Sequence, residues 1–208
     1  DGCVIARSNE AKALGIKMAQ PFFEIKHLCH TNHVTAFSSN YALYGDMSNR
    51  VMCILEASWP LVEVYSIDEA FLDLSSLKPE KIMPFCEVLH QKILQYTGLP
   101  VSIGIGQTRT LAKLANAIAK KDLKQPCFNI TYAKHWLDHK PVDQVWGIGK
   151  RWGQKLKQQG IQTAGQLKAA CPHQLRKQFN ITLARSALEL NGTSCISISD
   201  TETKKRIV

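Results

Sequence analysis

Apolar residues recur along the first 120 positions with two periods, one typical of helices and one typical of strands. A 3.6-residue period predicts amphipathic helices, and apolar–polar alternation predicts strands that bury one face. Helical spacing predicts helices over residues 8–14, 21–28, 41–57, 80–96 and 108–120. Alternation predicts two strands that flank residues 68–69, a strand over 99–105, and weaker strands over 3–6 and 33–38. This order predicts an α+β fold, an antiparallel sheet with helices packed on one face.

The pattern changes near residue 122, where short helical segments are interrupted by glycine and proline. One segment, Val145-Trp146-Gly147-Ile148-Gly149, precedes a basic helix and is typical of a helix-hairpin-helix element. Its glycines let the backbone approach a phosphate closely, and the N–H groups at a helix start can bind that phosphate. The basic residues that would add charge there are Lys150, Arg151, Lys155 and Lys157. A plain helix–turn–helix packing unit is the alternative, and the local charge favours DNA contact without base reading.

Composition places the chain among globular proteins. It has 208 residues, of which 45% are hydrophobic and 21% charged, and no apolar run is long enough to cross a membrane as a helix. Its seven cysteines are scattered and form no C-x-x-C pair. This distribution argues against a zinc site or a disulfide framework and favours a reducing cytosol.

Charge is distributed unevenly around a net value of +9. Residues 104–180 hold fourteen basic and three acidic residues, whereas residues 46–75 hold six acidic residues and one arginine. An acidic, strand-rich segment followed by a basic, helical one predicts a metal site beside a surface that binds a polyanion. A basic face that only adds solubility is the alternative, and the imbalance favours nucleic acid.

Two adjacent carboxylates, Asp68 and Glu69, interrupt the apolar run of residues 61–74 and lie where a hairpin turn is expected. At a turn, neighbouring side chains can converge, and convergent carboxylates repel each other unless a cation lies between them. Hard oxygen ligands suit Mg²⁺. An ordinary acidic β-turn is the alternative, since turns are rich in aspartate.

Several stretches in this order resemble the Y-family translesion DNA polymerases, over almost the whole chain. They read ARSNEAKALGI (6–16), YSIDEAFLD (65–73), SIGIG (102–106), LAKLAN (111–116) and VWGIG (145–149). Three others, DGCVIAR (1–7), FSSNY (37–41) and DMSNRVM (46–52), are most similar to the UmuC type, the catalytic subunit of a bacterial SOS polymerase.

The resemblance implies roles for individual residues. Asp68 and Glu69 would be catalytic palm carboxylates that hold two Mg²⁺ ions during nucleotidyl transfer. Lys12 and Lys120 match basic positions that contact the triphosphate, and Asn9 lies where relatives often carry a tyrosine that touches it. The expected DNA-binding residues are Lys113, Gly147, Gly149, Lys150, Arg151 and Lys155.

The resemblance also implies a domain plan. It predicts a partial fingers domain over 1–38, a palm over 39–125, a small helical thumb over 126–195, and over 196–208 the start of a linker to a further DNA-binding domain. The family's other catalytic aspartate would lie on a strand ahead of Asp1 and Gly2, so we expect residues 1–208 alone to be inactive.

Partners follow from the same resemblance. The substrates would be primer–template DNA and a deoxynucleoside triphosphate, and the protein partners a processed UmuD-type dimer, a RecA-type recombinase and the sliding clamp. The expected location is the bacterial cytoplasm, at the nucleoid, with no membrane partner. The main alternative is a non-catalytic DNA-binding protein, either a remnant or a degenerate paralogue. A Mg²⁺-dependent nuclease ranks lower, because no additional His or Glu in the motif supplies a base to activate water.

Overall fold

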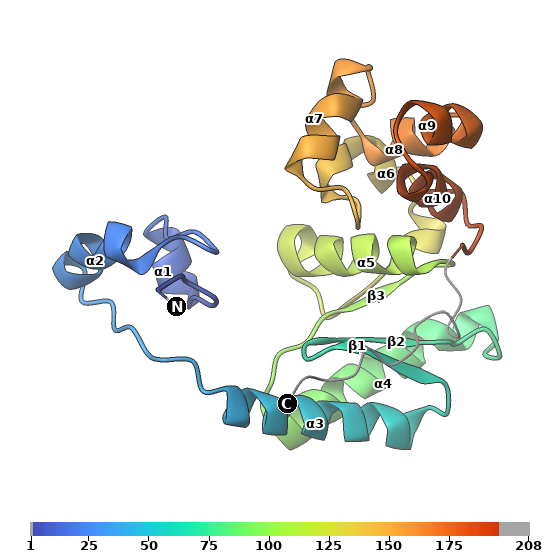
Figure 1. Cartoon of the computed structure of the whole chain (residues 1–208). Helices are drawn as coiled ribbons and strands as arrows, with labels where there is room; N and C mark the ends of the chain where they lie inside the picture. Colours follow the sequence, from blue (N-terminus) through green and yellow to red (C-terminus); the bar gives the residue numbers. More distant parts are fainter. Residues whose placement is uncertain (1, 196–208) are drawn as a thin grey trace. The chain divides into compact units, whose positions relative to one another are not determined.

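A computed structural model describes residues 2–195 of the chain (Figure 1). The chain divides into two compact units, one over residues 1–43 and one from residue 44 onward. The sequence-predicted linker over 196–208 lies outside the described residues. No helix in the described part of the chain has the length and apolar content to cross a membrane.

The first unit contains two helices, α1 (Asn9–Ala13) and α2 (Phe22–Thr31). The Ser8 hydroxyl accepts a hydrogen bond from the Ala11 N–H and so caps α1, and α1 and α2 confirm the two short helices predicted from the sequence. The helices share a small core, which consists of Ala11, Ile16, Ile25 and Cys29.

The two weak strands predicted in this unit are wrong. Cys3 forms a single antiparallel bridge with Pro21, and residues 33–38 contain no strand. A strand needs a neighbouring strand that satisfies its backbone N–H and C=O groups. Apart from the Cys3–Pro21 bridge, neither segment pairs with another strand among residues 2–43.

The second unit begins within a long helix and continues through a mixture of helices and short strands. Its first half contains α3 (Tyr41–Ser58, shared with the first unit), β1 (Val62–Ser66), β2 (Glu69–Leu72), α4 (Pro79–Thr97), β3 (Ile103–Ile105), α5 (Arg109–Ile118), the π-helical turn η1 (Ala119–Leu123) and β4 (Cys127–Asn129). Its second half contains the 3₁₀ turns η2 (Ile130–Tyr132) and η3 (Val142–Gln144), and α6 (Trp136–His139), α7 (Lys150–Gln158), α8 (Ala164–Ala169), α9 (Pro172–Gln178) and α10 (Ile181–Leu190).

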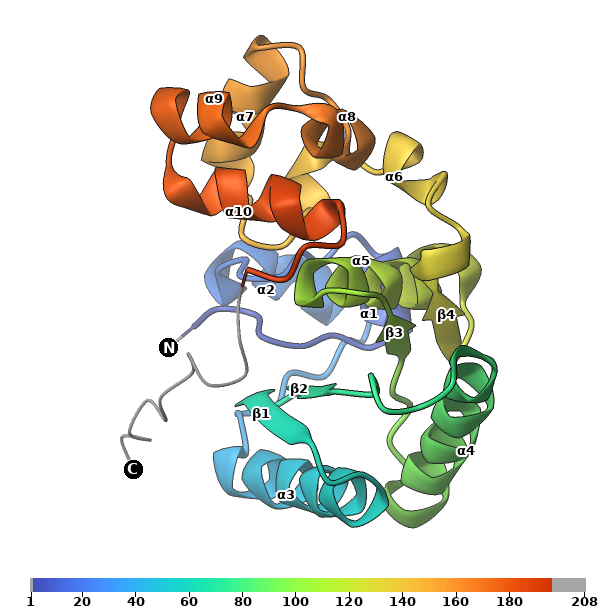
Figure 2. The same ribbon diagram turned by 90° about the vertical axis from the view of Figure 1, so that its right-hand side faces the viewer.

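Strands β1 and β2 form the predicted antiparallel hairpin. Alternation along both strands directs Val62, Val64, Ala70 and Leu72 to one face, where they pack against α3 and α4. The helical residues in this core are Met52, Leu55, Leu89 and Ile93. The opposite face of the hairpin carries Glu63 and Phe71, and it lies toward α5 (Figures 1 and 2).

Two of the predictions made for the sheet from the sequence are wrong. Strand β3 does not extend the antiparallel sheet but pairs with β4 in parallel, and helices lie on both faces of the strands rather than on one (Figure 2). The cause is the connection between the two strands. Parallel neighbours need a crossover, and α5 provides it by packing directly on β3. Gly104 permits this close approach, because a Cβ there would overlap the backbone of Ala112 and Asn116.

The largest hydrophobic core joins α5 to the helices that follow it. Leu111, Leu114 and Ile118 of α5 belong to the same buried cluster as Leu156 of α7 and Leu190 of α10. Between residues 130 and 190, short helices form a small layer that shares this core with α5. The boundary predicted between palm and thumb at residues 125–126 stays a prediction.

Candidate active site at the tip of the hairpin

The hairpin tip is a two-residue turn made of Ile67 and Asp68, and Glu69 begins β2 opposite Ser66. The Ser66 hydroxyl donates a hydrogen bond of 2.7 Å to Asp68 Oδ1 and lies 3.4 Å from the Asp68 N–H. Asp68 is exposed to solvent. The turn therefore presents one carboxylate outward, held in place by a short polar side chain two residues before it.

A β-bulge lies directly beside this turn. The pairing of β1 with β2 shifts by one residue between Val64 and Ser66, so Tyr65 is the extra residue. Bulges re-aim a side chain and increase the local twist of a strand. The Tyr65 ring lies edge-on to Phe71 at 5.7 Å and to Trp146 at 5.6 Å. The bulge thus brings the hairpin into contact with the segment that precedes Gly147.

The Glu69 carboxylate forms an ion pair with a lysine on α5. Lys113 Nζ on α5 lies 2.7 Å from Glu69 Oε2 and 4.9 Å from the ring centres of both Tyr65 and Trp146. The Lys113 side chain is 19% exposed and that of Glu69 is 44% exposed. We call Tyr65, Glu69 and Trp146 the Lys113 cage.

A second ion pair supports the same face one helical turn earlier. Both Glu63 oxygens accept hydrogen bonds from the Arg109 guanidinium, which also lies 5.2 Å from the centre of the Phe71 ring. The two charged side chains are nearly buried, at 8% and 10% exposure. A bidentate pair fixes both angle and distance, so it holds β1 against the start of α5.

The donor chemistry at the tip fits a hard divalent cation, because Asp68 and Glu69 present carboxylate oxygens from adjacent positions of one turn. The expected convergence of the two carboxylates stays a prediction. Each carboxylate has its own partner, Ser66 or Lys113, and residues 2–195 hold no cluster of three side chains suited to a metal. Asp73, four residues after Glu69, accepts a hydrogen bond from Ser75 that lowers the pKa of its carboxyl.

The residues predicted to bind nucleotide lie in two places. In the first unit, Lys12 Nζ donates to Asn9 Oδ1 at 3.1 Å, so these two side chains are together on α1. In the second unit, Lys120 lies in η1 and lines a shallow hollow. Its neighbours there are His90, Val101, Ser102, Lys124, Gln125 and Pro126. None of the residues of the Lys113 cage lines this hollow.

The predicted DNA-binding turn lies at the start of α7. Gly147 has φ of +84°, a conformation that favours glycine, and Gly149 is the N-cap residue without a side-chain cap. Arg151 and Lys155 lie 5.8 and 5.1 Å from the centre of the Trp152 ring. The short 3₁₀ turn η3 directly precedes this loop, where the expected helix-hairpin-helix would have its first helix, so that element stays a prediction.

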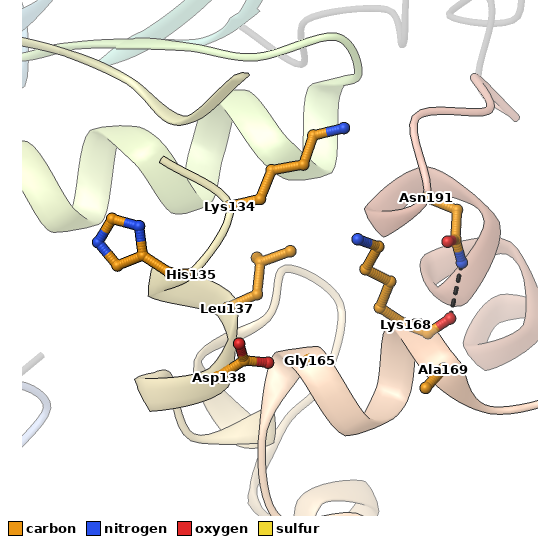
Figure 3. Close-up of a pocket in the computed structure, with 8 residues that line it drawn as sticks. All are labelled: Lys134, His135, Leu137, Asp138, Gly165, Lys168, Ala169 and Asn191. Carbon is orange, nitrogen blue, oxygen red and sulfur yellow. Dashed lines mark hydrogen bonds between the residues drawn. The ribbon is translucent and has the colours of Figure 1, made fainter. Parts of the chain in front are cut away.

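A separate hollow lies between α6, α8 and the end of α10 (Figure 3). Lys134 and Lys168 both line it, and Asn191 Nδ2 donates to the Lys168 carbonyl oxygen at 2.7 Å. The other lining residues are His135, Leu137, Asp138, Gly165 and Ala169. None of the residues predicted for catalysis or DNA binding lines this hollow.

Sequence reasoning missed the aromatic part of the site. Tyr65 and Trp146 are 81 positions apart, and each was noted only as part of its own motif. Arg109 and Lys113 are four residues apart on a helix, which places them on one face. That spacing was a usable signal that both would reach the hairpin.

Comparison with known proteins identifies relatives along almost the whole chain. The impB/mucB/samB family matches residues 1–117. The SamB protein of Salmonella typhimurium is 44% identical over 99% of this chain and 50% of its own length. The UmuC protein of the same organism is 45% identical over 96% of this chain and 49% of its own length. The chain thus spans about half the length of these relatives.

More distant relatives are named as polymerases. DNA polymerase IV 1 of Halalkalibacterium halodurans is 31% identical over 92% of this chain and 46% of its own length. Among solved structures, an insertion ternary complex of Dbh DNA polymerase superposes with a TM-score of 0.75, at 26% identity, over 90% of this chain and 55% of that one. A Y-family DNA polymerase chimera is also among the solved structures that this chain resembles. The match over residues 1–117, which include both carboxylates, shows that this chain belongs to the impB/mucB/samB family.

Proposed function

We propose that the protein carrying this chain is an error-prone DNA polymerase that copies past damaged bases in the SOS response. The observation that carries the proposal is the pair Asp68–Glu69 at an exposed hairpin tip, within a segment that matches the family. Two Mg²⁺ ions, when bound, would lower the pKa of the primer 3′-hydroxyl and stabilise charge on the triphosphate. Asp68 and Glu69 are the residues that would hold them.

The residues around the tip would orient these carboxylates. The Ser66 hydroxyl fixes Asp68 Oδ1 and leaves Oδ2 for a ligand, and the bulge at Tyr65 braces the tip against Trp146. The buried pair of Arg109 and Glu63 keeps β1 from sliding along α5. Preorganised ligands of this kind reduce the reorganisation needed when the reaction begins.

Cationic side chains would hold the incoming triphosphate. Lys12 lies beside Asn9 on α1, and Lys120 lies in η1 with Lys124 as a neighbour. A cation placed where phosphate charge develops favours the transition state. We assign Lys12, Asn9 and Lys120 to this role from the family resemblance.

The start of α7 would bind the DNA backbone. A Cβ at Gly149 would meet no atom within 4 Å, so there is open space beside this N-cap residue, and N–H groups at a helix start attract phosphate. Lys150, Arg151 and Lys155 add positive charge to the same helix. Such contacts fix the position of the duplex without reading its sequence.

The processed UmuD-type dimer, the RecA-type recombinase and the sliding clamp are proposed as protein partners on resemblance alone, as are the palm, fingers and thumb over the predicted ranges. A non-catalytic DNA-binding protein is the second candidate. The observation that favours it is that the described residues supply two carboxylates at the tip and no third.

Primer extension across an abasic site tests the proposal. We would compare the full-length protein with its Asp68→Asn variant, in Mg²⁺ with all four deoxynucleotides and the accessory partners. Asp46→Asn is the matched control, because Asp46 forms an exposed pair with Arg50 on α3. We expect at least about a hundredfold loss for Asp68→Asn and none for Asp46→Asn. Equal extension by both variants would contradict the role of Asp68, and DNA binding without extension by any of the three proteins would favour the second candidate.

A further inference from the structure

We propose that Lys113 is a built-in counter-cation for the metal-binding carboxylate, which a divalent ion displaces when it binds. The inference rests on the proposed function, since it takes Asp68 and Glu69 as the residues that hold the metal. The resemblance predicts Lys113 as a DNA-binding residue, but its surroundings point to Glu69.

The first observation is the contact itself. Lys113 Nζ lies 2.7 Å from Glu69 Oε2, which is the length of a charge-assisted hydrogen bond. Two adjacent carboxylates without a cation repel each other. The ammonium group removes that repulsion in the absence of metal, so the tip can keep its conformation before a metal arrives.

The second observation is the cage. The rings of Tyr65 and Trp146 each lie 4.9 Å from Lys113 Nζ, a distance at which ring faces attract a cation. The ion pair of an exposed lysine usually contributes little free energy, because water screens the charges and the long side chain loses entropy when it is held. With two rings and a carboxylate around it, Lys113 is only 19% exposed and is held in one place.

The third step is competition for the same oxygen atoms. A Mg²⁺ ion bonds to a carboxylate oxygen at about 2.1 Å. If the metal and Lys113 Nζ both contacted Glu69 Oε2, the two cations would lie less than about 5 Å apart. Two cations at that separation repel each other strongly. Metal binding therefore weakens the Lys113–Glu69 ion pair, and the ion pair in turn lowers the affinity for the metal.

Metal affinity measured without DNA tests this linkage. We would titrate the chain with Mn²⁺ and follow free Mn²⁺ by electron paramagnetic resonance, for wild type, Lys113→Gln and Lys113→Met. Removing the competitor should tighten Mn²⁺ binding about three- to tenfold, the size expected from loss of a partly exposed ion pair. Lys113→Arg keeps the cation and should stay within about twofold of wild type.

Two control variants separate this inference from the proposed function. Lys121→Gln removes the same charge from an exposed position in η1 and should leave affinity unchanged. Asp68→Asn should weaken binding if the tip is the metal site. Equal affinity of wild type, Lys113→Gln and Lys113→Met, with weakening by Asp68→Asn, would overturn the inference and keep the metal site. No effect of Asp68→Asn, or no Mn²⁺ binding by any variant, would overturn both.

A second readout follows the surroundings of Lys113 directly. The fluorescence of Trp146 should change as Mg²⁺ draws Glu69 away from Lys113, because the ammonium group lies over the indole ring. The change should be absent in Trp146→Phe and reduced in Lys113→Met. A change that persists in Trp146→Phe would show that it arises elsewhere and would count against displacement. Thermal unfolding of each variant gives the folded fraction for both experiments.

Discussion

At the scale of single residues, the buried pair of Arg109 and Glu63 is the strongest test of how the hairpin is held. Each side chain is about nine-tenths buried, and the guanidinium also lies over the Phe71 ring. Removal of one partner leaves the other charge buried without compensation, which is costly. We expect Arg109→Met to lower the free energy of unfolding by about 3 kcal/mol in urea denaturation.

The double variant Arg109→Met, Glu63→Met distinguishes the charge from the packing. Replacing both charged groups by apolar groups of similar volume removes the uncompensated carboxylate, so the double variant should be more stable than Arg109→Met alone. A double variant less stable than Arg109→Met alone would contradict the charge argument and show that the packing of the two side chains matters more.

At the scale of elements, the contact between β3 and α5 depends on a strand position without a side chain. A Cβ at Gly104 would overlap backbone atoms of α5, which cannot move as a flexible side chain can. Gly104→Ala should therefore force strand and helix apart and cost about 3 kcal/mol or more, measured by thermal or urea unfolding.

Gly45 offers the matched control for this prediction. It lies within α3, and a Cβ there would meet no atom within 4 Å. Gly45→Ala should be neutral or should stabilise the protein by up to about 1 kcal/mol, because alanine is the better helix former. Equal destabilisation by both substitutions would contradict the packing argument.

At the scale of the whole molecule, the cysteines report whether the second unit is folded. Burial raises the pKa of the Cys86 thiol to about 12, helped by nearby Cys127 and Glu87, and burial raises that of Cys127 to about 11. Cys3, Cys53 and Cys171 are exposed. At pH 8, iodoacetamide should modify these three in the native protein, and Cys86 and Cys127 only after denaturation. Native Cys86 modified as fast as Cys53 would contradict the described burial.

The same thiols predict how stability depends on pH. Their folded pKa values lie above the ordinary value of 9.0, so the folded state favours the neutral thiol. This contribution is complete below about pH 9 and is lost as pH rises through 11 to 12. The urea midpoint should therefore fall above about pH 9, and it should fall less steeply in the Cys86→Ala, Cys127→Ala variant.

The sequence by itself determined what depends on local periodicity and on short motifs. The five helices predicted before residue 122 are present, because their apolar stripes and caps lie within each segment. The hairpin turn at Asp68 is present as well, since alternation on both sides leaves only one place for it. The motifs also sufficed to indicate the family.

Only the tertiary structure decided which elements meet. The parallel pairing of β3 with β4 and the helices on both faces follow from the crossover through α5, which no local pattern encodes. The sequence around Lys113 is typical of an exposed lysine on a helix. In the structure, Lys113 contacts Tyr65 of β1, Glu69 of β2 and Trp146 of the loop before α7. The partner of a charged side chain depends on contacts between distant segments, and those form only when the chain buries its shared core.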